Sequence, residues 1–303
     1  MIKVILITGF LGAGKTTLVN NLLKIKKKKV GVLVNEFGKT GIDGKLIKGT
    51  EENITELNNG SIFCSCIKED FIKALAEIKD YEIEYLFIEA SGLSDPSNIK
   101  KILHTVEKVY NYRYNFSGSI CMVDALYFLK QYDLLPSLKR QIEHSHTIII
   151  NKVDLQNQDE IDKIEKLIKE INPESYIIKT EFAHIDENIV NSLKDNERPP
   201  EESTNTQESR PKTLVLKSNE VLDENSLYNF LEEMGEVTYR IKGFANTNNG
   251  SKEISVVGKN VNIVKWSKVE ETEIVFISSV GIKIISQISK KWKNYFEDKK
   301  YII

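Results

Sequence analysis

The sequence has no long hydrophobic run, few cysteines and no excess of charge of either sign. Its longest apolar stretches have the length of a β-strand, far short of the ~20 residues that a transmembrane helix needs. Three cysteines in 303 residues are too few for a disulfide scaffold and indicate a reducing compartment. Since 42 Lys and Arg residues nearly balance 44 Asp and Glu residues, a nucleic acid is not the expected partner. These absences predict a cytoplasmic protein that binds neither nucleic acid nor membrane.

Apolar strands alternate with helical segments in the N-terminal part of the chain. This order is typical of a parallel sheet covered by helices on both faces, with its ligand site at the carboxyl edge of the strands. The predicted strands are 2–8, 30–34, 85–89, 119–123, 147–150 and 176–179, and the predicted helices include 15–25, 71–79 and 160–171. The N-terminal part is therefore predicted to have an α/β fold.

The pattern changes near residue 195. Residues 195–211 contain three of the six prolines and no aliphatic or aromatic side chain, so this stretch cannot bury a core. Beyond it, a mixed order of strands and helices predicts a smaller α+β domain, with strands 213–217, 237–241, 254–257 and 274–278 and helices 225–234 and 283–296. The predicted division is a domain at 1–195, a linker at 196–211 and a C-terminal domain at 212–303.

Residues 9–16 read Gly-Phe-Leu-Gly-Ala-Gly-Lys-Thr and fit the P-loop pattern G-x-x-x-x-G-K-[ST] between a predicted strand and a predicted helix. The glycines let backbone N–H groups close around the phosphates of a nucleotide. Lys15 is predicted to reach the β- and γ-phosphates as a catalytic residue, and the Thr16 hydroxyl to bind Mg²⁺. The predicted phosphate-binding residues are Gly9, Gly12, Ala13, Gly14, Lys15, Thr16 and Thr17.

Residues 151–154 read Asn-Lys-Val-Asp and follow the predicted strand 147–150. The Asp154 carboxylate can accept hydrogen bonds from N1–H and from the exocyclic amino group of guanine, a donor pair that adenine lacks. Such bonds are worth ~1.5–3 kcal/mol each, so two of them discriminate by roughly 10²–10⁴-fold. Lys152 is expected to pack its stem on the base, and Asn151 to tie this loop to the P-loop. The predicted nucleotide is GTP, and the alternative of a P-loop kinase is disfavoured.

The predicted strand 85–89 ends in an acid, Glu89, and Gly92 follows three residues later. Glu89 is predicted to be catalytic and to hold Mg²⁺ through a water molecule, while the Gly92 N–H senses the γ-phosphate. Residues 93–95 are Leu, Ser and Asp, so no glutamine follows Gly92 to orient the attacking water. We therefore expect slow intrinsic hydrolysis that a metal or a partner stimulates.

Together with residues 34–44, which read Val-Asn-Glu-Phe-Gly-Lys-Thr-Gly-Ile-Asp-Gly, these motifs resemble the CobW family of P-loop GTPases. That family is related to the nickel-inserting GTPases of urease and hydrogenase. The resemblance runs nearly end to end, and its further positions are 89–93, 95–96, 123–125, 141–142, 151–155 and 240–244. It implies a P-loop NTPase sheet followed by a CobW-type C-terminal domain.

The resemblance also implies a function, namely GTP-dependent delivery of a metal, or of a metal-containing cofactor, to another protein. The implied partner is a client metalloprotein or cofactor-binding protein. A nucleotide-dependent dimer is an open alternative to a monomer.

The sequence departs from the family at its metal-binding motif. The family usually carries Asn-Gly-Cys-x-Cys-Cys before a helix, whereas Ser61 and Phe63 stand at the first two of these cysteine positions. Cys64 is retained, and Cys66 is an addition. Two thiols spaced i, i+2 offer soft ligands suited to Zn²⁺ or Co²⁺, and Glu36 or a client residue could complete the set.

Two functions therefore stay open. In the first, GTP hydrolysis drives a switch that releases a metal from Cys64 and Cys66 to the client. In the second, the protein is a GTP-gated factor that remodels its partner and has no metal site of its own. The altered cysteine motif and the absence of the family's His-rich interdomain stretch favour the second function. Cys121, within a predicted strand, is expected to be a core residue.

Overall fold

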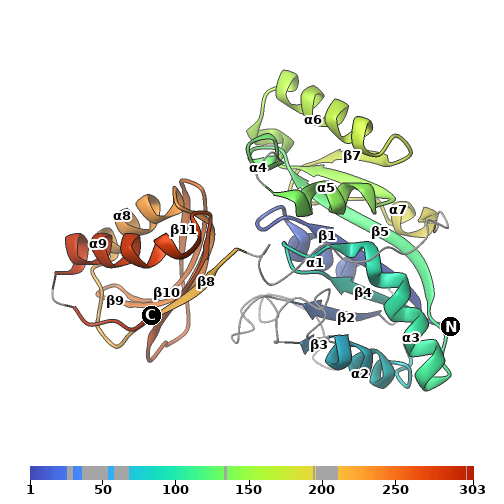
Figure 1. Ribbon diagram of the computed structural model, residues 1–303, viewed down its shortest axis with the longest axis horizontal. Coiled ribbons are helices and arrows are strands. Elements are labelled where there is room, and N and C mark those ends of the chain that lie inside the picture. The colour runs from blue at the N-terminus through green and yellow to red at the C-terminus, as the bar shows by residue number, and fades with distance from the viewer. Residues whose placement is uncertain are drawn as a thin grey trace. The chain divides into compact units, whose positions relative to one another are not determined.

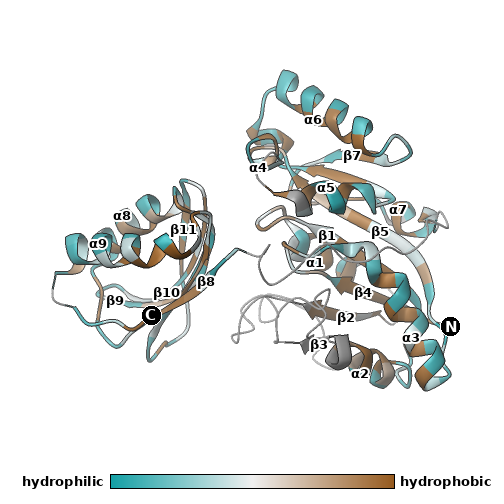
Figure 2. Ribbon diagram, viewed as in Figure 1, coloured by the Kyte–Doolittle hydropathy of each residue, from teal (hydrophilic) through white to brown (hydrophobic). Residues whose placement is uncertain are grey.

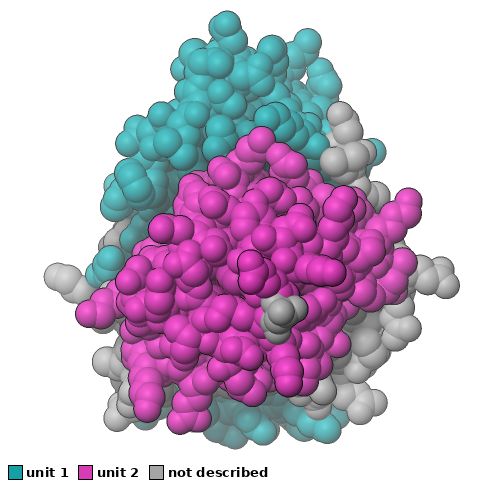
Figure 3. Space-filling view, turned by 90° about the vertical axis from the view of Figure 1, so that its left-hand side faces the viewer, with its two compact units in different colours: residues 1–208 teal, residues 209–303 magenta. Residues whose placement is uncertain are grey.

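The computed structural model describes residues 1–25, 30–35, 54–57, 68–132, 135–193, 195, 211–297 and 299–303. The chain divides into two compact units, residues 1–208 and residues 209–303 (Figure 3). Within the described ranges, no helix combines the length and the apolar character that crossing a bilayer requires.

The first unit is built on a seven-stranded sheet in the order β3-β2-β4-β1-β5-β6-β7 (Figure 1). All neighbouring strands run parallel, which confirms the predicted α/β fold. The strands are β1 (Lys3–Gly9), β2 (Val30–Asn35), β3 (Ile54–Leu57), β4 (Tyr85–Glu89), β5 (Asn115–Asp124), β6 (Thr147–Asn151) and β7 (Tyr176–Thr180). The strand β3 was not predicted from the sequence, and β5 begins four residues before the predicted strand 119–123.

Helices pack on both faces of this sheet because the central strands are apolar on both sides. Val4 and Leu6 of β1 lie in a core cluster with residues of α2 and α3. Ile5 and Ile7 point to the opposite face, into a cluster with residues of α1 and α7. The helices are α1 (Lys15–Ile25), α2 (Lys68–Ile78), α3 (Ile99–Tyr110), α4 (Phe128–Tyr132), α5 (Pro136–Glu143), α6 (Gln158–Ile171) and α7 (Glu187–Ser192).

The second unit is a five-stranded antiparallel sheet in the order β11-β10-β9-β12-β8. Phe230 of α8 packs edge-on against Phe276 of β12 and against Trp292 and Phe296 of α9. The antiparallel sheet and its two helices confirm the predicted α+β character of this part. The elements are β8 (Thr213–Ser218), α8 (Glu224–Gly235), β9 (Thr238–Thr247), β10 (Gly250–Val257), β11 (Asn260–Lys265), β12 (Thr272–Ser278) and α9 (Ile284–Phe296).

Hydropathy follows the same layers in each unit, with hydrophobic residues along the strands and polar residues on the outer sides of helices such as α6 (Figure 2). The helix α6 begins where the Asn157 side chain accepts a hydrogen bond from the Glu160 N–H, and its buried residues Ile161, Ile164 and Ile168 share one face. The consequence for function is that the carboxyl ends of all seven described strands of the first unit lie at one edge of the sheet.

Candidate functional site

The loop between β1 and α1 needs its glycines. Gly9, Gly12 and Gly14 have φ angles of 128°, 82° and 107°, in the left-handed region that favours glycine. A Cβ atom on Gly9 would lie 2.3 Å from the Met122 carbonyl oxygen, and one on Gly14 would lie 2.5 Å from Asn151 Nδ2. The loop therefore packs so closely on Met122 of β5 and Asn151 of β6 that a side chain at Gly9 or Gly14 would not fit.

Lys15 is held over this loop. Its ammonium group donates to the carbonyl oxygens of Gly9 at 2.9 Å and Phe10 at 3.1 Å, and the residue is only 8% exposed. A cation desolvated to this degree strongly favours an anionic ligand. The neighbouring residue Ala13 is buried, whereas Thr17 in the first turn of α1 is exposed.

Thr16 and Glu89 come together although they are 73 positions apart in the sequence. The Thr16 hydroxyl donates to Glu89 Oε1 at 2.8 Å. Glu89 ends β4, which pairs with β1 so that Ile7 lies beside Glu89, and its side chain is buried. A hydroxyl and a carboxylate at one point are the hard oxygen donors that Mg²⁺ prefers, so the pair fits this ion.

Gly92 packs directly on the P-loop. A Cβ atom at this position would lie 2.6 Å from the backbone nitrogen of Leu11, so only glycine permits the approach. The segment 90–98 is buried throughout. The predicted γ-phosphate sensor is thus a backbone group fixed against the phosphate-binding loop itself.

Asn151 joins three loops at the carboxyl edge of the sheet. Its Nδ2 donates to the Ala13 carbonyl oxygen at 2.9 Å, and its Oδ1 accepts from the Ala183 N–H at 2.9 Å. The side chain is 2% exposed. These contacts place the segment 151–154 directly beside the P-loop.

Lys152 and Asp154 differ in their surroundings. Lys152 has a left-handed backbone conformation, with φ of 64°, and its ammonium group lies 2.5 Å from Asp124 Oδ2 at the end of β5. Asp154 lies in the short 3₁₀ turn Val153–Leu155 and is exposed, so its carboxylate is accessible to a base. Asp124 is thus a partner of Lys152, a contact that the sequence alone did not indicate.

The loop after β7 also contributes to this region, although no motif in the sequence predicted it. Phe182 and Ala183 have φ angles of 52° and 55°, and the Asn21 side chain of α1 donates to both of their carbonyl oxygens at 3.0 Å. Phe182 is 68% exposed, while Ala183 is buried. The only sequence signal for this loop was its place after a strand of the same parallel sheet.

The predicted transition-metal ligands Glu36, Cys64 and Cys66 lie outside the described residues. Among the residues that are described, no three or more His, Cys, Asp or Glu side chains gather where they could hold a metal ion. The third cysteine, Cys121, is buried in β5, and burial raises the pKa of its thiol to about 12. A thiol held in its protonated form is a poor metal ligand.

Comparison with known proteins gives two family matches. Residues 3–179 match the CobW/HypB/UreG nucleotide-binding domain, and residues 212–294 match the C-terminal domain of the cobalamin synthesis protein CobW. The first match covers more than half of the chain.

Several curated proteins share sequence with the chain, including one from Dictyostelium discoideum and one from Escherichia coli. The zinc-regulated GTPase metalloprotein activator 1 of Dictyostelium discoideum is 32% identical over 59% of this chain and 46% of its own length. The zinc chaperone YjiA of Escherichia coli is 32% identical over 61% of this chain and 59% of its own length. The chain thus spans about half the length of the curated relatives it matches. A crystal structure of Zn(II)-bound YjiA GTPase from E. coli matches with a TM-score of 0.48 and 19% identity, over 97% of this chain and 98% of that one.

Proposed function

The chain belongs to the CobW/HypB/UreG family of nucleotide-binding proteins, and from that membership and its site we propose that it is a GTPase that delivers a transition metal to a client protein. The proposal assigns nucleotide binding to residues 1–195 and a client-facing surface to residues 212–303, joined by the linker 196–211. The client is a metalloprotein or a cofactor-binding protein.

The observation that carries the proposal is the Asn151 junction. One buried side chain ties the loop that contains Asp154 to the P-loop carbonyl of Ala13 and to the N–H of Ala183. A base held by Asp154 and phosphates held by residues 9–17 then belong to one nucleotide. Because Asp154 offers two acceptors to the two donors of guanine, the nucleotide is GTP.

Different residues of the P-loop contact different phosphates of the nucleotide. The backbone of Gly9, Gly12, Ala13 and Gly14 surrounds the α- and β-phosphates, and Thr17 contacts the α-phosphate. Lys15 exchanges its carbonyl contacts for the β- and γ-phosphate oxygens, where it stabilises the negative charge of the transition state.

Thr16 and Glu89 hold Mg²⁺, the latter through a water molecule, and when bound the ion neutralises charge on the phosphate oxygens. Gly92 N–H contacts the γ-phosphate. A water molecule attacks the γ-phosphorus, the bond to the β–γ bridging oxygen breaks, and GDP and phosphate leave.

Hydrolysis by the protein alone is slow. Ser94 and Asp95, the polar residues that follow Gly92, are both fully buried, and Asp95 is paired with Arg140. Neither side chain is therefore placed to orient a water molecule at the γ-phosphate. We expect an intrinsic turnover well below ~1 s⁻¹, since faster rates are typical of partner-activated GTPases.

The cargo site is formed by Cys64 and Cys66, with Glu36 or a client residue completing the set, and it takes Zn²⁺ or Co²⁺. Two relatives are named as a zinc chaperone and a zinc-regulated activator, which supports zinc. Against a metal stands the replacement of two family cysteines by Ser61 and Phe63. The second candidate is therefore a GTP-gated factor that remodels its partner without metal. Both candidate functions are compatible with a monomer and with a nucleotide-dependent dimer.

A competitive Zn²⁺ and Co²⁺ titration of the reduced full chain separates the two candidates. It is run with and without Mg²⁺ and a non-hydrolysable GTP analogue, beside a Cys64→Ser/Cys66→Ser variant. Thermodynamic linkage makes the effect reciprocal. If the nucleotide raises the affinity for the metal by some factor, the metal raises the affinity for the nucleotide by the same factor. Nucleotide-sensitive binding that is lost in the variant supports metal delivery. Weak metal binding that changes neither with nucleotide nor with the loss of the two cysteines contradicts metal delivery and supports the partner-remodelling factor.

A further inference from the structure

The loop that contains Gly92 is held from behind by one side chain of α5. Gln141 Nε2 donates to the Gly92 carbonyl oxygen at 3.1 Å and to the Ser94 carbonyl oxygen at 2.9 Å. Gln141 and Ser94 are fully buried. Since a buried carbonyl left without a donor is costly, these two bonds strongly favour one position of the loop.

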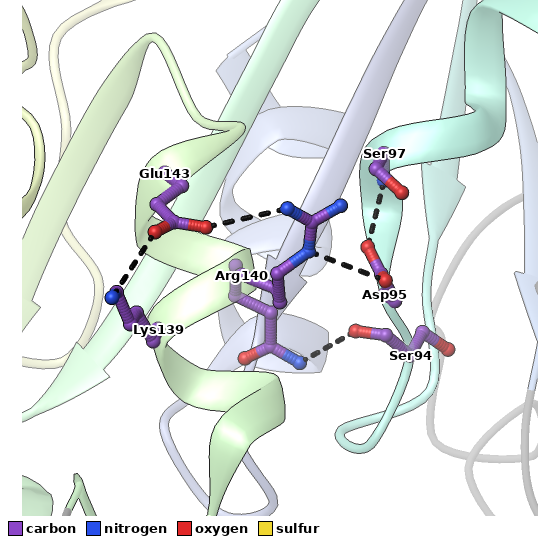
Figure 4. A network of polar contacts seen from close by, with 7 residues as sticks. Ser94, Asp95, Ser97, Lys139, Arg140 and Glu143 are labelled. Carbon is purple, nitrogen blue, oxygen red and sulfur yellow. Dashed lines mark hydrogen bonds and ion pairs between the residues drawn. The ribbon is translucent and has the colours of Figure 1, made fainter. Parts of the chain in front are cut away.

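The far end of the same loop is held by the neighbouring residue of α5. Arg140 Nε lies 3.4 Å from Asp95 Oδ2, while Asp95 Oδ1 accepts from the Ser97 N–H at 3.0 Å. Arg140 also lies 3.5 Å from Glu143, which pairs with Lys139 on the outer side of the helix (Figure 4). Asp95 is fully buried, so its charge depends on Arg140.

The C-terminal end of α5 is itself fixed to Asn172, the residue that follows α6. The Asn172 side chain donates to the carbonyl oxygens of Ile142 at 2.9 Å and Ser145 at 2.8 Å. The Ser145 hydroxyl donates to the Gln141 carbonyl oxygen at 2.7 Å. Gln141 therefore extends from a rigid support and does not follow the loop freely.

The chemistry at Gly92 gives these contacts a function. A glycine has no Cβ atom to restrict its backbone, so the direction of its N–H depends on what holds the adjoining peptide groups. The Gly92 carbonyl, one peptide further along, is held by Gln141. Preorganised donors stabilise a developing charge better than donors that must first be ordered.

We propose that Gln141 is a positioning residue that fixes the Gly92 peptide for contact with the γ-phosphate, and that Arg140 secures the same loop through Asp95. This inference rests on the proposed GTPase function and names the helix that supports its phosphate sensor. The contact favours the binding of GTP over that of GDP, because only GTP carries the γ-phosphate that Gly92 contacts. The loop and α5 together form the element that responds to the nucleotide state.

The test compares Gln141→Met, which keeps the volume and removes both donor bonds, with Lys139→Gln as the matched control. Lys139 lies on the same helix and touches only Glu143 of the network. The full chain is titrated with GDP and with a non-hydrolysable GTP analogue in Mg²⁺, and single-turnover hydrolysis is followed. We expect the ratio of analogue affinity to GDP affinity to fall about tenfold in Gln141→Met, and hydrolysis to slow similarly. Affinity for GDP stays within about twofold, and Lys139→Gln behaves as wild type.

Equal losses for GDP and for the analogue, or no loss for either, overturn the inference. Gln141→Asn, which keeps a polar side chain but shortens it by one methylene group so that the amide no longer reaches both carbonyl oxygens, serves as a second variant with a milder effect in the same direction, should Gln141→Met fail to fold. Hydrogen exchange provides an independent readout: in the wild type the analogue protects the amides of residues 92–98 and 138–145 more than GDP does, and Gln141→Met removes this difference. A wild-type chain that binds no GTP contradicts the proposed function itself. If the wild type binds the GTP analogue and GDP with different affinities, and Gln141→Met shows the same affinities, only the positioning role of Gln141 is contradicted.

Discussion

Lys152 Nζ lies 2.5 Å from Asp124 Oδ2, so the lysine of the proposed guanine-binding segment 151–154 is held by the last residue of the neighbouring strand β5. Asp124 is 4% exposed, and its other carboxylate oxygen accepts from the Leu126 N–H at 3.0 Å. Lys152 also adopts a left-handed backbone conformation, which costs energy in a residue with a side chain. The ion pair stabilises a strained turn at the point where the base is expected to bind.

Replacing Asp124 by Asn should weaken the binding of GDP and GTP equally, by about tenfold, because a charge-assisted bond to Lys152 is lost. Equilibrium titration with a fluorescent guanine nucleotide measures the change. Glu165→Gln is a suitable control, since Glu165 pairs with Lys179 on an exposed surface. A loss confined to GTP would contradict this explanation, because Asp124 is assigned to the base and not to the γ-phosphate.

Replacing Asp154 by Asn should change the base that the protein selects. The amide can no longer accept from both guanine donors, so the affinity for GTP should fall by roughly 10²–10⁴-fold. Xanthine carries a carbonyl group where guanine carries its amino group, and the amide can donate to it. Competition between GTP and xanthosine triphosphate measures the switch. Unchanged preference for GTP in the folded variant would remove Asp154 from the base site.

Replacing Thr16 by Ala should abolish the dependence of GTP binding on Mg²⁺, because the hydroxyl that faces Glu89 is lost. In saturating Mg²⁺ we expect a loss of affinity of about tenfold or more, and almost none in the presence of a chelator. Thr16→Ser keeps the hydroxyl and is the matched control. If the Ser variant lost as much affinity as the Ala variant, the methyl group of Thr16 would be responsible and the magnesium role would be wrong.

Most of the fold followed from local patterns. The apolar run of β1 predicts a strand buried on both faces, and Val4 and Ile5 do lie in clusters on opposite sides of the sheet. The strand β3 was missed because Ile54–Leu57 is only four residues long and carries two polar residues at the edge of the sheet. The strand β11 was also missed, although its Val261, Ile263 and Val264 are β-branched residues that favour a strand.

The candidate site was predictable where its chemistry lies in consecutive residues. The P-loop and the segment 151–154 can be identified from the sequence because their spacing is fixed by the ligand. Gln141 and Ala183 could not be assigned in this way, since each acts through contacts with residues more than 30 positions away in the sequence. Such pairs depend on how the strands and helices pack, which spacing along the chain does not encode.

A last prediction concerns the second unit. Glu233 of α8 accepts hydrogen bonds from Lys291 and from Tyr295 of α9, and these two bonds, the Lys291 bond foremost, lower the pKa of Glu233. A carboxyl group whose pKa is lowered by folding stabilises the folded state above its unfolded pKa. That stabilisation is lost as the pH falls through the folded value. The contribution should therefore be complete at pH 7 and disappear in acid, below the ordinary glutamate pKa of about 4.3.

Glu233→Gln should consequently lower the Tm of the full chain at pH 7 by about 1–5 °C, since half-exposed ion pairs contribute ~0.2–1 kcal/mol. The difference from wild type should shrink as the pH is lowered through this range, and calorimetry at several pH values measures both effects. Glu236→Gln is the control, because Glu236 pairs with Lys259 on a more exposed surface, and it should change Tm less. A difference between Glu233→Gln and wild type that stayed constant with pH would show that packing of the side chain, and not its charge, links α8 to α9.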